Sequence, residues 1–238
     1  MIALIDSDIF VYRIAHAAKN EDSLKAVQRT VQTTINNLLL FDLDVDDYEL
    51  HLTDGKKNFR NEKAVTVPYK GERKSEKPRW YDEIREYMVN EFEATIHYTI
   101  EADDMLAIRA TELGEDESII VSLDKDLDQV QGWHYNFVKQ EKYYVDYPNA
   151  ILNLAKQFLT GDRVDNIRGV KGIGPVKAQR LLGELTTWEE MWEVIEEKLG
   201  TDRAIENGHL LYMLRTRDDE FSPTNKHLRR IQPSSVED

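Results

Sequence analysis

The 238-residue sequence contains no cysteine, which excludes disulfide bonds and zinc sites built on thiolates. It also lacks any run of about 18 consecutive apolar residues, so it predicts no membrane-spanning helix. The first residues, MIALIDSD, place aspartates where a secretory signal peptide needs an apolar core. We therefore expect a cytoplasmic protein with no membrane partner, whose fold does not depend on the redox state of its compartment.

The sequence also has fewer basic than acidic residues. Lys and Arg number 31 against 45 Asp and Glu, which gives a formal net charge of −14. A nucleic-acid partner needs Lys and Arg for its phosphates, so the total by itself argues against one. A metal enzyme can nevertheless carry a dense group of carboxylates beside a basic patch. The distribution of charge along the chain must therefore decide between these interpretations.

Four short segments rich in β-branched or aromatic residues each end in an acid. They are IALID (2–6), YELHLTD (48–54), ATIHYTIE (94–101) and SIIVSLD (118–124). Helix-length segments occupy 9–19, 23–41, 80–93 and 103–113. Strands that alternate with helices predict an α/β fold, with a mostly parallel sheet flanked by helices. In such sheets, ligands bind at the carboxyl ends of the strands.

The acids at the strand ends are the main sign of chemistry in this sequence. A parallel sheet would bring four of them to one edge: Asp6, Asp54, Glu101 and Asp124. One such aspartate is as readily explained as a helix N-cap. Four in succession, with Asp103 and Asp126 two positions after the last two, are hard to explain as caps. Clustered carboxylates repel one another unless a cation holds them, and oxygen ligands at this density suit Mg²⁺ or Mn²⁺.

After residue 130 the pattern changes to a hairpin at 134–146 and then to mostly helical sequence. The helical segments are expected at 148–160, 175–182, 187–199 and 203–216. Between the first two of these segments, TGDRVDN (160–166) carries Asp162 and Asp165 on one side of a turn or helix start. Alone, these two acids would be read as a cap and a solvated carboxylate. Beside a metal-binding edge they become candidates for holding a second cation.

The stretch GVKGIGPVKAQRLL (169–182) has the glycine spacing of a helix-hairpin-helix motif. Gly172 and Gly174 permit a tight turn and the close approach of a phosphate, which N–H groups of the next helix can bind. Three cations add positive charge nearby: Lys171, Lys177 and Arg180. Such hairpins hold the DNA backbone without reading its sequence. The plainer alternative is a glycine-rich loop between two packed helices.

Residues 56–79 form a basic segment, with nine cations against three acids, a local balance of +6. Aromatic residues are interleaved with these cations: Phe59, Tyr69, Trp80 and Tyr81. A cationic loop with stacking rings suits single-stranded nucleic acid. The alternative is a solvated surface loop with a bias towards lysine. Its position after the Asp54 strand, at the expected carboxylate edge, favours the functional interpretation.

Six motifs in this order resemble the 5′ nuclease superfamily, which includes flap endonucleases and the 5′–3′ exonuclease domain of bacterial DNA polymerase I. They are LIDSDIFVYR, LTDGKKNFR, VPYKGERK, EADDMLA, VSLDKDLDQV and GDRVDNIRGVKGIGPVKA, and they cover residues 4–178. The chain looks most like the phage-encoded stand-alone members, which act in the cytoplasm of the host cell. The resemblance implies a PIN-like (Rossmann-like) catalytic domain at 1–146, with a basic arch at about 56–93. A helical DNA-binding region with an H3TH motif would follow at 147–230, and then a frayed tail at 231–238.

The resemblance also implies two sites for Mg²⁺ or Mn²⁺. By motif position, the first would use Asp6, Asp54, Glu101 and Asp103. The second would use Asp124, Asp126, Asp162 and Asp165. Asp104 would take a catalytic part, either bridging the ions or hydrogen-bonding their ligands. Asp8, from the DSD that replaces a frequent DG, has no assigned role.

For DNA, the resemblance implies that Lys70 and Arg73 of YKGER approach the scissile phosphate and that Tyr69 stacks on a terminal base. The hairpin would hold the duplex, in the family through a bound K⁺ as well. The full set assigned to DNA is Arg60, Tyr69, Lys70, Arg73, Lys74, Arg168, Lys171, Gly172, Gly174, Lys177 and Arg180. Arg168 stands where many relatives have proline.

The implied reaction is metal-dependent hydrolysis of DNA phosphodiesters near a 5′ end or 5′ flap by a monomer. The balance of exonuclease and flap cutting stays open, as does action on RNA–DNA hybrids. A phosphatase of the haloacid dehalogenase type, using the Asp-x-Asp of LIDSDIF, is one rival. It leaves the hairpin and the basic segment unexplained. A non-catalytic structure-specific DNA-binding protein is the other rival, and it leaves the clustered acids unexplained.

Overall fold

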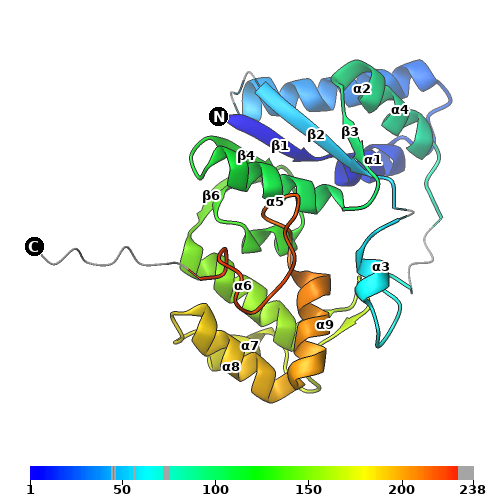
Figure 1. Ribbon diagram of the computed structural model, residues 1–238. Helices are drawn as coiled ribbons and strands as arrows, with labels where there is room; N and C mark the ends of the chain where they lie inside the picture. Colours follow the sequence, from blue (N-terminus) through cyan, green and yellow to red (C-terminus); the bar gives the residue numbers. More distant parts are fainter. Residues whose placement is uncertain (44, 46, 56, 72–75, 230–238) are drawn as a thin grey trace, which may run out of the picture.

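The computed structural model describes residues 1–43, 45, 47–55, 57–71 and 76–229. Its centre is a six-stranded sheet in the order β3-β2-β1-β4-β5-β6 (Figure 1). The first five strands in this order are parallel, and β6 runs antiparallel to β5. The strands are β1 (Ile2–Asp6), β2 (Asp47–Thr53), β3 (Thr95–His97), β4 (Ser118–Val121), β5 (Gly132–Asn136) and β6 (Glu141–Val145). The α/β fold with a mostly parallel sheet is therefore confirmed.

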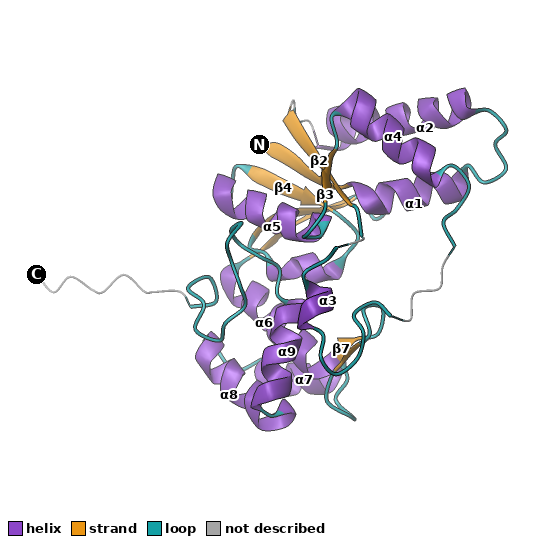
Figure 2. Ribbon diagram, turned by 45° about the vertical axis from the view of Figure 1, so that its right-hand side comes forward, coloured by secondary structure: helices purple, strands orange, loops and turns teal. Residues whose placement is uncertain are grey.

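Helices cover both faces of the sheet (Figure 2). One face packs against α1 (Ser7–Ala17), α2 (Leu24–Asn37) and α4 (Tyr81–Phe92), and the other against α5 (Ala102–Leu113). The sequence of β1 explains this arrangement. Ala3 and Ile5 join the core under α1, α2 and α4, whereas Leu4 between them joins the core under α5. Successive side chains of a strand point to opposite faces, so a fully apolar strand is covered on both.

A helical region lies beside the sheet, at the bottom of Figure 1. It contains α6 (Tyr147–Thr160), α7 (Pro175–Leu182), α8 (Trp188–Leu199) and α9 (Thr201–Leu211). A short hairpin, β7 (Gly161–Asp162) and β8 (Ile167–Arg168), connects α6 to α7. The core of this region also includes Met105 and Ile108 of α5. The α5 helix therefore packs against both the sheet and the helical region.

Several predicted elements differ in length from the observed ones, and three of these differences have a clear structural reason. The strand predicted at 94–101 is only Thr95–His97, because this edge strand pairs with β2 over three residues and Tyr98 already faces solvent. The helix predicted at 23–41 ends at Asn37 and continues as a π-helix (Leu38–Leu43). The helix predicted at 203–216 ends at Leu211, where Tyr212 is extended and the chain turns to pair with Gln129.

Parts of the predicted arch and tail fall outside the description. Within the arch predicted at about 56–93, the described residues form a short α3 (Arg60–Lys63) and the helix α4. The tail predicted at 231–238 lies wholly outside the described residues. Over the part of the chain that is described, no helix has the length and apolar character needed to cross a bilayer.

Candidate active site

Asp6 lies at the carboxyl end of the central strand β1 and also begins α1. Its carboxylate accepts hydrogen bonds from Ile9 N at 3.4 Å and from Ser122 Oγ at 2.7 Å. The residue is 3% exposed, and burial raises the pKa of Asp6 to about 7. The charges of Asp8 and Asp124 raise this pKa further. A carboxylate so placed favours a nearby cation.

Asp103 comes from the first turn of α5 and faces the same edge of the sheet. Burial raises its pKa well above the usual range, and the charges of Asp6, Asp124 and Glu101 raise it further. These interactions place Asp103 within electrostatic reach of acids on two other elements. Of the four strand-end acids predicted to converge, three influence the pKa of Asp103: Asp6, Glu101 and Asp124.

A second group of acids begins after β4. Asp124 caps the 3₁₀ helix η2 (Lys125–Gln129) by accepting from Asp126 N at 2.9 Å. Burial, together with the charges of Asp124 and Asp162, raises the pKa of Asp126 to about 8. Gln157 of α6 donates to the Asp126 carboxylate at 2.7 Å. The helical region therefore helps to orient an acid of the sheet edge.

The β7–β8 turn supplies Asp162 and Asp165. Their charges contribute to the raised pKa of Asp124, for which burial is the largest cause. The turn can approach α6 closely because two glycines face each other. A Cβ on Gly161 would lie 2.2 Å from Gly169 N, and a Cβ on Gly169 would lie 2.4 Å from Gly161 N. We call the gathered acids the carboxylate edge: Asp6, Glu101, Asp103, Asp124, Asp126, Asp162 and Asp165.

Lys70 contacts two acids of the carboxylate edge. Its Nζ contacts the Glu101 carboxylate and lies 3.6 Å from Asp165 Oδ2. Its charge lowers the pKa values of Asp103 and Asp124, against the larger effect of their burial. The Lys70 backbone has a left-handed conformation, with φ of 53°, which is uncommon outside glycine. The predicted approach of Lys70 to the scissile phosphate stays a prediction.

The donors of the carboxylate edge suit a hard divalent cation, because they are carboxylate oxygens and several carry raised pKa values. Within the described ranges, however, no three His, Asp or Glu side chains form a ready-made metal-binding group. In the described arrangement, Lys70 instead supplies positive charge to Glu101 and Asp165. The residues fit a cation chemically, and metal binding would require side chains to rearrange.

Two sequence predictions are corrected by a buried ion pair. Arg60 is 3% exposed and Asp104 is 0% exposed. The guanidinium donates to both Asp104 oxygens at 2.6 and 2.7 Å, and also to the carbonyls of Leu210 and Tyr212. Arg60 is therefore not available to DNA. Asp104 also accepts from Leu214 N and from the Glu101 amide, so its oxygens are not free to bridge metal ions. The other predicted role, hydrogen-bonding a metal ligand, agrees with its contact to Glu101 and stays a prediction.

Tyr69 also differs from its predicted role. Its ring is 7% exposed, which leaves no face for stacking on a terminal base. Its hydroxyl oxygen lies 2.8 Å from a carboxylate oxygen of Glu101 and 2.8 Å from one of Asp165, so its one proton is shared between the two acids. Burial raises the pKa of Tyr69, and Glu101 raises it further, so the phenol stays protonated and can donate its proton to either acid. Tyr69 thus connects the two halves of the carboxylate edge.

Three predicted site residues are not placed in the carboxylate edge. Asp54 follows β2 and is half-buried, and its amide pairs with the His97 carbonyl. No hydrogen bond or ion pair links its carboxylate to the other acids in the described part of the chain, so its metal role stays a prediction. Arg73 and Lys74 lie outside the described residues.

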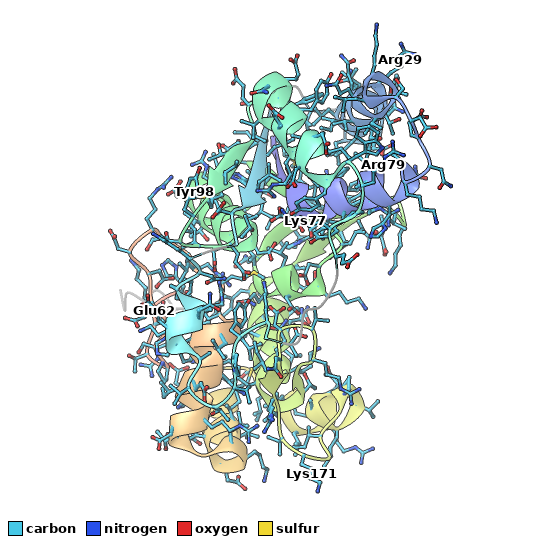
Figure 3. All side chains as sticks on the ribbon, turned by 90° about the vertical axis from the view of Figure 1, so that its right-hand side faces the viewer. Arg29, Glu62, Lys77, Arg79, Tyr98 and Lys171 are labelled. Carbon is cyan, nitrogen blue, oxygen red and sulfur yellow. The ribbon has the colours of Figure 1, made fainter. Side chains whose placement is uncertain are left out.

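The predicted DNA-binding hairpin presents an exposed loop at the far end of the helical region, where Lys171 projects outward in Figure 3. Gly172 adopts φ of 81°, and a Cβ on either Gly172 or Gly174 would meet nothing within 4 Å. Pro175 occupies the first turn of α7. The cations around this loop are exposed: Arg168, Lys171, Lys177 and Arg180. The loop is therefore open to a phosphate backbone.

Sequence reasoning missed two groups that support the site. Asp8 accepts from Arg85 NH1 at 2.7 Å and from Thr53 N at 2.9 Å, so it joins α1, α4 and the end of β2. Gln157 and Ser122 each hydrogen-bond an acid of the carboxylate edge. Ser122 could have been found from its place two residues before Asp124. Nothing in the local sequence marks Arg85 or Gln157.

Together, the fold and the carboxylate edge define a PIN-like α/β protein with acids at the carboxyl ends of a parallel sheet. No family model matches the chain. It is 30% identical to flap endonuclease Xni of Shewanella halifaxensis over 84% of both chains. It is 28% identical to a 5′-3′ exonuclease of Buchnera aphidicola over 82% of this chain and 74% of that one. The chain therefore belongs to the 5′ nuclease family.

The fold agrees with this assignment. A solved structure of T5 5′-exonuclease with bound zinc has a TM-score of 0.64 to this chain. It covers 89% of this chain and 88% of its own, at 19% sequence identity.

Proposed function

We propose that the protein is a structure-specific 5′–3′ exonuclease and flap endonuclease that hydrolyses DNA phosphodiesters near 5′ ends. Family membership supports the activity, and the carboxylate edge supports the chemistry. The observation that carries most weight is the gathering of Asp6, Asp103 and Asp124 from three elements, each with a raised pKa. Such a cluster opposes folding unless a cation compensates it.

The cofactor that we propose is a pair of Mg²⁺ or Mn²⁺ ions. Asp6, Glu101 and Asp103 would hold the first ion, together with Asp54. Four acids would hold the second: Asp124, Asp126, Asp162 and Asp165. When bound, such ions supply an activated water and neutralise charge on the leaving oxygen. Other side chains orient these ligands through hydrogen bonds. Ser122 bonds Asp6, and Gln157 bonds Asp126. Tyr69 bonds Glu101 and Asp165.

Lys70 would act on the substrate phosphate. Its ammonium already lies beside the acids, so a phosphoryl group held there would meet a preorganised positive charge. Arg73 is proposed to assist it on sequence grounds. No side chain needs to act as a nucleophile in this reaction, which agrees with a chain that has no cysteine.

The duplex would be held at a distance from the acids by the exposed loop at 169–174. Backbone N–H groups at the start of α7, with Lys171, Lys177 and Arg180, would bind phosphates. A K⁺ ion at this loop is part of the proposal. We propose a monomer divided near 146/147 into a catalytic domain and a helical DNA-binding region. Action on the RNA of RNA–DNA hybrids is a finer proposal on the same site.

One assay tests this function. The protein is incubated with 5′-flap, blunt duplex and RNA–DNA hybrid substrates, with Mg²⁺ or with EDTA, and the products are sized. We expect Mg²⁺-dependent cleavage near the 5′ end. No cleavage of any of these substrates in Mg²⁺ or Mn²⁺ would contradict the proposal.

The phosphatase alternative is less well supported. It needs Asp8 as a free acid/base two residues after a nucleophilic Asp6. Asp8 is instead paired with Arg85 and Thr53 N, which hold it away from proton transfer. Rapid hydrolysis of p-nitrophenyl phosphate with no nuclease activity would favour that alternative.

A further inference from the structure

The segment that carries Lys70, which we call the Lys70 loop (residues 64–71), is fixed by backbone hydrogen bonds in addition to the side-chain contacts of Tyr69 and Lys70 with the acids. Lys70 N donates to the Asp165 carbonyl at 3.0 Å, and Asn166 Nδ2 donates to the Pro68 carbonyl at 2.9 Å. These bonds hold the end of the loop to the β7–β8 turn. Because the Lys70 backbone has a left-handed conformation, it needs such support to keep that conformation.

The side chain of Glu206 in α9 holds the beginning of the Lys70 loop. Its Oε1 accepts from Val65 N at 2.7 Å and from Thr66 N at 2.6 Å. Its Oε2 accepts from the Thr66 hydroxyl. These bonds lower the pKa of Glu206, against a burial effect that raises it. A charged acceptor makes stronger hydrogen bonds than a neutral one, so this contact is the main tether of an otherwise exposed turn.

The helix that presents Glu206 is itself anchored beside the hairpin. Arg203 donates to the carbonyls of Arg168 and Gly169 at 3.0 and 3.3 Å. Asn207, which is buried, donates to the Arg168 carbonyl at 3.1 Å. Three neighbouring residues of α9 thus connect β8, and the DNA-binding loop that follows it, to the Lys70 loop.

We propose that Glu206 is a positioning residue that fixes the Lys70 loop so that the Lys70 ammonium reaches Glu101 and Asp165. This inference rests on the proposed role of Lys70 in cleavage. Glu206 contacts Val65 and Thr66 and not the acids. Its effect must therefore pass through the loop residues that reach the acids, which are Lys70 and Tyr69. That effect is assigned to Lys70, because its ammonium would act on the phosphate. Removing the Glu206 carboxylate would free Val65 and Thr66 and let the ammonium move relative to the phosphate.

The test uses the full chain in single-turnover cleavage of a 5′-flap duplex with Mg²⁺, and DNA binding is measured separately in EDTA. Glu206→Leu is expected to slow cleavage about 10- to 100-fold, because small misplacements of a catalytic group are costly. The dissociation constant for DNA is expected to stay unchanged. Glu206→Gln is expected to cleave at close to the wild-type rate, since its amide oxygen can accept both N–H groups and its NH₂ can donate to Thr66.

Two further variants separate positioning from general stability. Asp202→Ala removes an exposed acid from the first turn of the same helix and is expected to leave the cleavage rate unchanged. Thr66→Val removes only the hydroxyl contact to Glu206 and is expected to slow cleavage less than Glu206→Leu does. If Glu206→Leu shows no cooperative thermal unfolding, and so is not properly folded, Thr66→Val takes its place in the experiment below.

The decisive experiment is a double-mutant cycle with Lys70→Ala. If Glu206 acts through Lys70, then Glu206→Leu has no further effect on the rate when Lys70 is already absent. Additive losses in the double variant would overturn the inference, as would a wild-type rate for both Glu206→Leu and Thr66→Val beside a slow Lys70→Ala. A wild-type rate for Lys70→Ala would instead contradict the proposed function of Lys70 itself.

Discussion

Asp103 and Asp104, two neighbouring acids at the start of α5, lie in regions that differ in how the negative charge is compensated. Asp103 joins the carboxylate edge, where burial and the charges of Asp6 and Asp124 raise its pKa. Asp104 faces the other way and forms a two-point ion pair with Arg60, with two backbone N–H groups completing its partners. The charge of Asp104 is thus compensated by a direct ion pair, whereas Asp103 forms no ion pair with any residue that the structure describes and is only partly offset by the charge of Lys70. An incompletely compensated acid of this kind marks a site for a ligand.

The largest expected effect concerns the incompletely compensated acid. Asp103→Ala should reduce Mg²⁺-dependent cleavage by more than about 100-fold, because loss of a metal ligand should cost more than loss of an outer partner. The variant should still bind DNA, since the exposed loop at 169–174 is untouched. Single-turnover cleavage and a binding titration measure the two properties. Full activity in Mg²⁺ would remove Asp103 from the proposed site.

Asp104→Ala should instead act on stability. It leaves the buried Arg60 guanidinium without its carboxylate, which should cost about 3–5 kcal/mol in the free energy of unfolding. Urea unfolding in EDTA measures this, and Asp103→Ala is the matched control from the same helical turn. That control should keep or gain stability, because it removes repulsion and not a partner. Equal losses in the two variants would contradict the distinction between the two acids.

Two lysines extend the comparison to the cations. Lys70→Ala should slow cleavage about 100-fold, as expected for one preorganised electrostatic contact. Lys77 lies over the ring of Tyr81, but it is exposed and pairs with Asp82. Lys77→Ala should therefore change the cleavage rate much less than Lys70→Ala does. Comparable slowing in both variants would mean that the lysines act through general attraction for DNA.

The smallest expected effect is the pH dependence of the metal-free protein. Asp6 and Asp126 have pKa values of about 7 and about 8, above their values in the unfolded chain. The folded state therefore binds more protons, and its stability should fall as pH rises towards 8 in EDTA. Mg²⁺ should raise the melting temperature more at pH 8 than at pH 6, and Asp126→Asn should reduce that difference. A Mg²⁺ effect independent of pH would count against this account.

Much of the fold follows from the sequence, because the strands and helices are strongly patterned. β1 and α7 have the predicted bounds, and the parallel sheet follows from the alternation of strands and helices. The bounds that could not be predicted depend on contacts distant in sequence. The end of α9 is one example, since Gln129 pairs with the chain beyond it from 84 residues away.

The candidate site also depends on contacts between residues that are distant in sequence. Motif position selects Asp103 and Asp104 alike, and only the fold shows that Arg60 lies against one of them. Tyr69 and Arg60 stand in a basic, aromatic stretch that is typical of nucleic-acid binding, yet both side chains are buried. Composition indicates what a segment can bind, and tertiary packing decides which of its residues are left free to do so.

The most direct test is the anomalous difference map of a crystal soaked in Mn²⁺. We expect one ion beside Asp6 and Asp103 and a second beside Asp126 and Asp162, with the Arg60–Asp104 pair intact and no ion contacting it. An ion coordinated by Asp104, or no ion at the carboxylate edge at saturating Mn²⁺, would contradict the account.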